Sequence, residues 1–263
     1  MKGIKGIDVS TLQGLISWTR VKADGVDFAM IKATQGRGEG ASTRHLRVFT
    51  DSKFATNIRA AHNAGLQCGV YHYFTATTDA EAEYEAEHFV ETIKPYKQYI
   101  DLWAAVDAES EPYLGKVGKT TLTSATKTFM DCVKKQGFKP MLYTNPNYLK
   151  YRFTPNAFKY DDIWLAHWGV SKPMSVPNTQ IWQYGLGRVS GINTDVDMNE
   201  GYFDDGQYQD STKSEPRQYK VGDKYTVKKG DKYTNGKSAD GVAGETYTCR
   251  AWQDTCTANQ QLD

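Results

Sequence analysis

Two carboxylic acids separated by one residue end an apolar stretch near the middle of this 263-residue chain. In the segment LWAAVDAE, which begins at Leu102, these acids are Asp107 and Glu109. Side chains alternate along a β-strand, so both acids face one side, with carboxyl groups on the order of 5–7 Å apart. Like charges at that distance raise one pKa, and partial burial raises it further. One protonated acid beside one ionised acid is the arrangement that glycoside hydrolysis requires.

Two further acids favour this catalytic interpretation over a pair of loop acids or a divalent-metal site. Asp8 ends the first apolar stretch and Asp197 lies in the last. In a closed barrel the first and last strands are neighbours, and active sites form at the carboxyl ends of the strands, so all four acids would share one mouth. We expect no metal and no cofactor, because neither His72 nor His167 has a spacing such as H-E-x-x-H.

Five aromatic side chains fall at the same level as the acids and are candidates for binding sugar rings, because Tyr and Trp combine an apolar face with a polar group. They are Tyr71, Tyr73, Tyr143, Trp168 and Tyr184. Barrel strands also need bulky side chains to fill the interior. We therefore expect two or three of the five in the groove and the others in the core.

The elements that position these residues alternate, up to about residue 205, between short apolar runs and amphipathic segments, which predicts βαβ units. Eight strands are predicted: Gly6–Ser10, Asp27–Ala33, Gln67–Phe74, Leu102–Ala108, Pro140–Thr144, Asp162–Trp168, Thr179–Tyr184 and Thr194–Met198. Helices are predicted at Ser52–Ala64, Asp79–Ile93 and Thr120–Lys135. Eight strands favour a closed, TIM-like barrel over an open doubly wound sheet. The last two connections are too short for full helices, so we predict an α/β fold that is an irregular (β/α) barrel with fewer than eight helices.

Composition and charge narrow the class of function. Hydrophobic residues make up 39% of the chain and charged residues 24%, which is enough for a packed core. A net charge of +1 gives no reason to expect nucleic acid as a partner. We expect no membrane insertion, because no stretch approaches the roughly 20 apolar residues that span a bilayer. The first residues lack the apolar core of a secretory signal, so we expect synthesis in the cytoplasm.

The composition changes after residue 207. Residues 208–217 are polar and lack periodicity, which is typical of a linker. Residues 218–263 contain the motif GDKYT twice, at 222–226 and 230–234, and their Tyr, Val and Thr between Gly turns predict a small β-rich tail. So short a segment is marginal for folding alone. Cys249 and Cys256 could form a disulfide outside the cell.

Taken in order, these motifs resemble glycoside hydrolase family 25, the Chalaropsis-type lysozymes, over about residues 4 to 203. The motifs that carry the resemblance are GIDVS at 6–10, DFAMIKAT at 27–34, GVYHY at 69–73, DAE at 107–109, WLA at 164–166, IWQY at 181–184 and VDMN at 196–199. The resemblance implies an irregular β/α barrel without a metal requirement. It also implies an N-acetylmuramidase that hydrolyses the β-1,4 bond between N-acetylmuramic acid and N-acetylglucosamine in bacterial peptidoglycan.

The same resemblance implies a role for each acid. Glu109 would be the general acid and base, and Asp107 would assist the substrate's 2-acetamido group. Asp8 and Asp197 would tune the charge and position this pair. Whether the route is substrate-assisted or direct is left open. The chain departs from the family pattern at Gln35, where members often have Glu.

The tail resembles part of a bacterial Src-homology-3-like cell-wall-binding module up to Thr248, beyond which the expected strands do not continue. Together with the missing signal, this resemblance implies a phage endolysin that is released by a holin and acts on the cell wall. A non-catalytic peptidoglycan-binding protein on a decayed barrel is the alternative, although the presence of all four acids argues against decay. A metal-dependent hydrolase is the third hypothesis.

Overall fold

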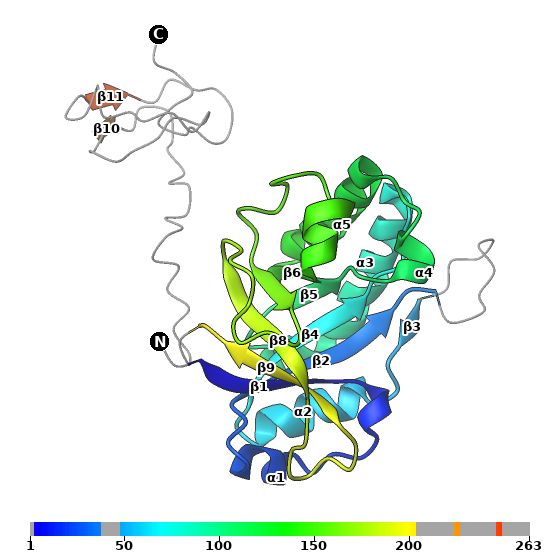
Figure 1. The fold of residues 1–263 in the computed structure, drawn as a ribbon, viewed down its shortest axis with the longest axis vertical. Coiled ribbons are helices and arrows are strands. Elements are labelled where there is room, and N and C mark those ends of the chain that lie inside the picture. Colours follow the sequence, from blue (N-terminus) through cyan, green and yellow to red (C-terminus); the bar gives the residue numbers. More distant parts are fainter. Residues whose placement is uncertain (1–2, 38–47, 204–223, 227–245, 249–263) are drawn as a thin grey trace. The chain divides into compact units, whose positions relative to one another are not determined.

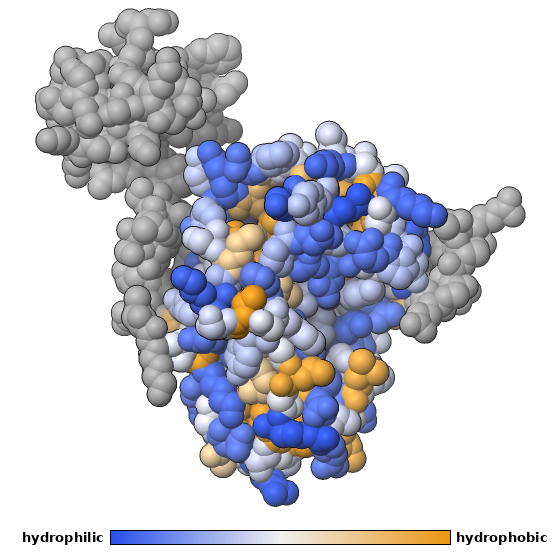
Figure 2. All heavy atoms as spheres, in the orientation of Figure 1, coloured by the Kyte–Doolittle hydropathy of each residue, from blue (hydrophilic) through white to orange (hydrophobic). Residues whose placement is uncertain are grey.

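The computed structural model describes residues 3–37, 48–203, 224–226 and 246–248 of the chain. The chain divides into two compact units, residues 1–204 and 205–263. The first unit contains all of the predicted site residues. The face of this unit in Figure 2 mixes hydrophilic and hydrophobic residues.

The described strands of the first unit form one nine-stranded sheet, which closes because the first strand pairs with the second (Figure 1). Eight strands make the barrel: β1 (Ile4–Val9), β2 (Phe28–Gln35), β4 (Gln67–Tyr73), β5 (Ala104–Asp107), β6 (Pro140–Thr144), β7 (Ile163–Ala166), β8 (Thr179–Gly187) and β9 (Val196–Gly201). The short β3 (Phe49–Thr50) pairs only with the end of β2. The predicted α/β barrel, and all eight predicted strands, are therefore confirmed.

The barrel differs from a TIM barrel in the direction of its last strand. β9 runs antiparallel to both of its neighbours, β1 and β8, whereas the other barrel strands are parallel. The expectation of a TIM-like barrel is wrong in this respect. The reason is the connection of residues 188–195, because a parallel return requires a crossover of a dozen or more residues whereas a hairpin does not.

Helices pack on the outside of the barrel against β2, β4, β5 and β6, and they are fewer than eight among the described residues, as predicted. The α-helices are α1 (Trp18–Ala23), α2 (Phe54–Asn63), α3 (Asp79–Ile93), α4 (Glu111–Leu114) and α5 (Lys119–Lys135). Shorter turns are η1 (Thr11–Gln13), η2 (Lys94–Tyr99) and η3 (Tyr148–Arg152). None of the described helices is long and apolar enough to cross a membrane.

Local sequence signals explain where the longest helices begin and end. The hydroxyl of Thr78 accepts a hydrogen bond from the backbone N–H of Glu81, which caps the first turn of α3. α5 ends just before Gly137, whose φ of +75° reverses the chain at no steric cost. The alternating side chains of the strands then pack outward against these helices and inward into the barrel.

One end of the barrel is closed by large aromatic side chains. Phe28 and Trp103 lie where β2 and β5 begin, and Phe203, which follows β9, packs edge-on against both rings at 5.2 and 5.1 Å between centroids. Gly6 leaves room for the Phe28 ring, because a Cβ there would collide with it. The carboxyl ends of the parallel strands lie at the opposite end of the barrel, which these three rings do not close. The polar residues gather there.

In the second unit the described strands are β10 (Lys224–Thr226) and β11 (Thr246–Thr248), which pair antiparallel. The first copy of the GDKYT motif contributes β10, in agreement with the predicted β-rich tail. The predicted linker, Cys249 and Cys256 lie outside the described residues.

Candidate active site

The structure brings the four predicted acids together at the open end of the barrel. Asp107 is the last residue of β5 and Glu109 follows two residues later. Asp8 lies near the end of β1, directly opposite Asp197 at the start of β9. Each acid acts electrostatically on others of the set, since Glu109, Asp8 and Asp197 all raise the pKa of Asp107.

Glu109 is half-buried and is held by two side chains from β6 and the loop after it. Tyr143 Oη donates to Oε1 at 3.2 Å, and Asn145 Nδ2 donates to Oε2 at 3.3 Å. Burial raises the pKa of Glu109, while these two hydrogen bonds lower it. The result is a fixed carboxyl group that is still accessible and more readily protonated than an ordinary glutamate. This combination suits a general acid.

Asp107 is more deeply buried, with 8% of its surface exposed. Burial and the charge of Glu109 raise its pKa well above the usual range, and Lys32 opposes them. Among the described residues nothing donates a hydrogen bond to its buried Oδ1. Burying an acceptor without a hydrogen-bond partner costs free energy. This oxygen is therefore available to a donor that the described part of the chain does not supply.

Asp8 is held at the same mouth by two amides. Its Oδ2 accepts from Gln183 Nε2 at 2.9 Å and from Asn199 Nδ2 at 2.8 Å. Burial, then the charges of Asp197 and Glu109, raise its pKa to about 8 against the lowering effect of both amides. The protonated form of Asp8 is thus more favoured than in an ordinary aspartate, which limits the negative charge that gathers around Glu109.

Gln183 links these acids into one network. Its Oε1 accepts from Tyr143 Oη at 3.0 Å and from Trp168 Nε1 at 2.9 Å, while its amide donates to Asp8. Tyr143 has a single hydroxyl proton for two acceptors, Gln183 and Glu109. A chain of hydrogen bonds therefore connects Asp8 to Glu109, so that a change in the protonation of one acid is felt by the other.

The predicted aromatic residues divide between the mouth, the barrel interior and the outer face. Trp168 is 47% exposed at the mouth, and Tyr73 is half-buried with its hydroxyl 2.8 Å from Ser110 Oγ. Tyr71 packs edge-on against Trp164 inside the barrel. The structure does not bring Tyr184 to the site. It alternates with the inward-facing Gln183 and instead packs on the outer face.

The two histidines have structural surroundings. His72 faces outward, with Nε2 2.8 Å from Glu85 Oε2 and its ring stacked on Phe129 at 5.0 Å. His167 Nδ1 accepts from the backbone N–H of Met174 at 3.0 Å. Within the described ranges, no three His, Cys, Asp or Glu side chains are grouped as a metal site would require. Independence from metals remains a prediction.

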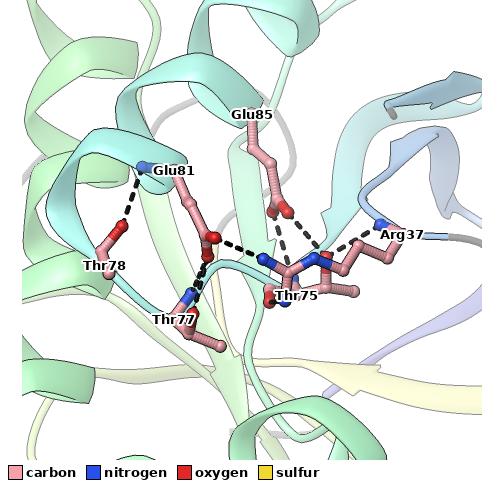
Figure 3. A network of polar contacts seen from close by, with 6 residues as sticks. All are labelled: Arg37, Thr75, Thr77, Thr78, Glu81 and Glu85. Carbon is pink, nitrogen blue, oxygen red and sulfur yellow. Dashed lines mark hydrogen bonds and ion pairs between the residues drawn. The ribbon is translucent and has the colours of Figure 1, made fainter. Parts of the chain in front are cut away.

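Glu85 belongs to a buried network that joins α3 to the exit of β2 (Figure 3). It accepts from the backbone N–H of Thr75 at 3.1 Å and from its hydroxyl at 2.6 Å. Arg37, which is 5% exposed, pairs with Glu81, and Glu81 also accepts both the N–H and the hydroxyl of Thr77 at 2.7 Å. These contacts fix the loop after β4 and the end of β2 to one helix.

Comparison with known proteins identifies the family. A model described as "Glycosyl hydrolases family 25" matches residues 7–192, which is more than half of the chain. The chain belongs to glycoside hydrolase family 25. The match runs from within β1 to beyond β8 and ends before β9, the strand that carries Asp197.

Individual relatives agree with this assignment. The chain is 33% identical to an autolytic lysozyme of Clostridium acetobutylicum over 75% of its own length and 55% of the relative's. It is 31% identical to lysozyme M1 of Streptomyces globisporus, over 75% and 67% of the two lengths. A crystal structure of a bacterial lysozyme from Streptomyces coelicolor superimposes with a TM-score of 0.64 and 28% identity, covering 77% of this chain and 93% of that one. The chain therefore spans about half the length of the clostridial relative.

Four residues of this family 25 site lie among the acids but were not predicted as site residues: Lys32, Asn145, Gln183 and Asn199. A signal existed for Lys32, a lone charge in the apolar strand FAMIKAT. Asn145 follows the end of β6 as Glu109 follows the end of β5. The two inward amides, Gln183 and Asn199, could be found only by knowing that β8 and β9 flank one another and turn those residues toward Asp8.

Proposed function

We propose that this chain is a lysozyme, an N-acetylmuramidase that hydrolyses the β-1,4 bond between N-acetylmuramic acid and N-acetylglucosamine in bacterial peptidoglycan. The observation that carries the proposal is the unequal pair of acids at the mouth. Glu109 is accessible and hydrogen-bonded, whereas Asp107 is buried with a free acceptor oxygen. The lysozyme relatives support the same substrate class.

In this mechanism protonated Glu109 donates its proton to the glycosidic oxygen as the bond to the anomeric carbon breaks. The carbonyl oxygen of the substrate's own 2-acetamido group attacks that carbon and forms an oxazolinium ring. Asp107 Oδ1 accepts the acetamido N–H and balances the positive charge that develops on the ring. Glu109, now a carboxylate, takes a proton from the water that opens the ring, so both acids return to their starting states. Substrate-assisted glycosidases dispense with a protein nucleophile in this way.

Asp8 and Asp197 have a supporting role in this proposal. Their charges raise the pKa of Asp107, and Asp8 is linked to Glu109 through Gln183 and Tyr143. Trp168 and Tyr73 are the aromatic side chains best placed to contact sugar, since both are partly exposed at the mouth. Tyr143 acts on Glu109 directly.

The test is the turnover of Glu109→Gln on Gram-positive cell walls. Loss of a general acid costs about a hundredfold to ten-thousandfold in rate, so release of reducing ends should fall by that amount while the circular dichroism spectrum is unchanged. Glu91→Gln, the same change on the exposed face of α3, is the matched control and should leave the rate unaltered. Near-normal activity of Glu109→Gln would refute the assignment.

Two controls separate the alternatives. A non-catalytic peptidoglycan-binding protein would sediment with walls and release no reducing ends at all. A metal-dependent hydrolase would lose its activity in EDTA, whereas the proposed enzyme keeps it.

We also propose the more specific role of a phage endolysin that reaches the wall through a holin. Its support is the resemblance of the tail to wall-binding modules, and most of that tail lies outside the described residues. Expression inside a bacterium tests it, since lysis should require a co-expressed holin. Lysis of equal speed without a holin would contradict this role and leave the muramidase proposal intact.

A further inference from the structure

One charged side chain at the mouth has no part in the mechanism above. Lys32 lies on β2 and is half-buried, in register with Tyr71 on β4. Its Nζ donates to Gln35 Oε1 at 2.7 Å and lies 5.2 Å from the centre of the Tyr73 ring. Tyr73 is the register partner of both Gln35 on β2 and Asp107 on β5. The lysine and the aspartate therefore flank the same tyrosine.

Lys32 is a positively charged side chain among acidic ones. Asp107 and Asp51 face it, and behind Asp107 stand Glu109, Asp8 and Asp197. Among the described groups that act on Asp107, Lys32 is the one that favours the ionised form. Tyr71 and Tyr73 also face this cluster, and burial raises the pKa of both phenols, so they remain neutral.

The partners of the ammonium group hold it in place without cancelling its charge. Gln35 offers a neutral amide oxygen, and Tyr73 offers a ring face, which attracts a cation but carries no net charge. A carboxylate at residue 35 would instead form an ion pair with Lys32 at the same distance. Its negative charge would offset much of the lysine's positive charge. The identity of residue 35 thus decides how much of the lysine's charge reaches Asp107.

We propose that Lys32 is a positioning residue that keeps Asp107 ionised during turnover, and that Gln35 sets the strength of this effect by fixing the lysine through a neutral contact. The inference rests on the proposed function, because an ionised Asp107 is what stabilises the oxazolinium ring. The pKa shifts have the matching signs. Lys32 lowers the pKa of Asp107 against burial, and Asp107 raises the pKa of Lys32 against burial.

The expected consequence is a displaced acid limb in the pH profile of kcat/KM. Removing a positive charge makes ionisation of Asp107 harder, so its pKa rises and the acid limb moves to higher pH. An opposite charge nearby shifts a carboxyl pKa by about 1 to 3 units, so Lys32→Met should move the limb upward by about one pH unit or more. Gln35→Glu should move it in the same direction by a smaller amount. Lys32→Arg, which keeps the charge, should move it least.

The experiment measures two quantities on each variant. The first is the pH profile of kcat/KM on cell walls. The second is the titration of the Asp107 carboxyl carbon by NMR in protein labelled at aspartate, which needs no turnover. Gln35→Ala removes the hydrogen bond without adding a charge, and Gln98→Glu adds the same charge on exposed η2 at the closed end of the barrel. Neither control should displace the limb as far as Gln35→Glu.

The results separate failure of this inference from failure of the proposed function. If the wild-type chain releases no reducing ends, the proposed function is wrong, and the NMR titration alone decides the role of Lys32. If it is active but Lys32→Met and Gln35→Glu titrate Asp107 as the wild type does, the inference is overturned. It is also overturned if Gln35→Ala shifts the limb as far as Gln35→Glu, because the effect would then be one of position and not of charge. Should Lys32→Met fail to fold, Gln35→Glu at its partly exposed position carries the test.

Discussion

Asp8 and Asp197 stand directly opposite one another on two antiparallel strands, β1 and β9. Directly opposed residues on such strands have Cα atoms about 4.5–5.5 Å apart, which forces the two carboxyl groups into one another's field. The reversal of β9 makes this possible, because Asp197 is at the start of its strand and Asp8 is near the end of its own. Asp197 is accordingly the largest electrostatic contributor to the raised pKa of Asp8.

This pairing predicts how the stability of the protein depends on pH. The pKa of Asp8 is about 8 in the folded chain, against about 3.9 for an unfolded aspartate. Folding therefore takes up a proton between these values, and the free energy of unfolding falls as the pH rises from about 4 to about 8. Asp8→Asn removes this dependence and keeps an oxygen for Gln183 and Asn199. Its stability relative to the wild type should rise by at least about 1 kcal/mol between pH 5 and pH 8.

Urea unfolding at several pH values measures this difference. Asp131→Asn, on the exposed face of α5, is the matched control and should show no such trend. A constant difference between Asp8→Asn and the wild type across that range would mean that Asp8 is ionised in the folded chain.

Tyr143 gives a prediction for the other limb of the activity profile. Its hydrogen bond lowers the pKa of Glu109, so Tyr143→Phe should raise that pKa. Since Glu109 must be protonated to act as the acid, the basic limb of kcat/KM should move to higher pH. Asn145→Ala should act in the same direction, because it removes the other hydrogen bond that lowers the pKa. Tyr84→Phe, on the exposed side of α3, serves as the control, and a basic limb that moves downward would contradict the assignment of Glu109.

Asp107 should distinguish the substrate-assisted route from a direct one. A thiazoline analogue of the oxazolinium ring, when its ring nitrogen is protonated, presents an N–H donor to Asp107 Oδ1, which has no hydrogen-bond partner among the described residues. It should inhibit the wild-type chain competitively and bind Asp107→Asn at least about tenfold more weakly, the cost of a lost charge-assisted hydrogen bond. Equal binding to both proteins would favour a direct attack by Asp107 on the anomeric carbon.

The network around Glu85 should matter for stability and not for chemistry. Glu85→Ala would leave the buried N–H and hydroxyl of Thr75 and the ring of His72 without their acceptor. Breaking a buried hydrogen-bonded carboxylate costs about 3–5 kcal/mol. The control is Glu87→Ala, which changes an exposed glutamate of α3 two residues after Glu85. It should alter the free energy of unfolding in urea by less than about 0.5 kcal/mol. Similar losses for both variants would show that the network contributes little.

The sequence was most informative where local patterns decide the outcome. Short apolar runs between amphipathic segments predicted all eight barrel strands, and α3 was predicted from its periodicity and from Pro95 beyond it. The direction of β9 was missed because apolar residues mark a buried strand and not its orientation. The length of the preceding connection held that information.

The site was predictable at its acids and less so around them. Asp107 and Glu109 stand out because charge is unusual at the end of an apolar strand. Tyr184 was predicted at the site, but its neighbour Gln183 is the residue of β8 that faces the acids. One step along a strand reverses the face on which a side chain lies. The amides that hold Asp8 come from β8 and β9, so their role depends on strand neighbours that are distant in sequence.

The most direct test of the proposed reaction is the chemical identity of the sugar at each new chain end. Purified peptidoglycan is digested with the protein, reduced with borohydride and examined by mass spectrometry, with Glu109→Gln as the blank. Cleavage of the muramidase bond predicts N-acetylmuramitol at the reduced ends and no newly released amino groups. Reduced N-acetylglucosamine at those ends, or new amino groups without new reducing ends, would contradict it.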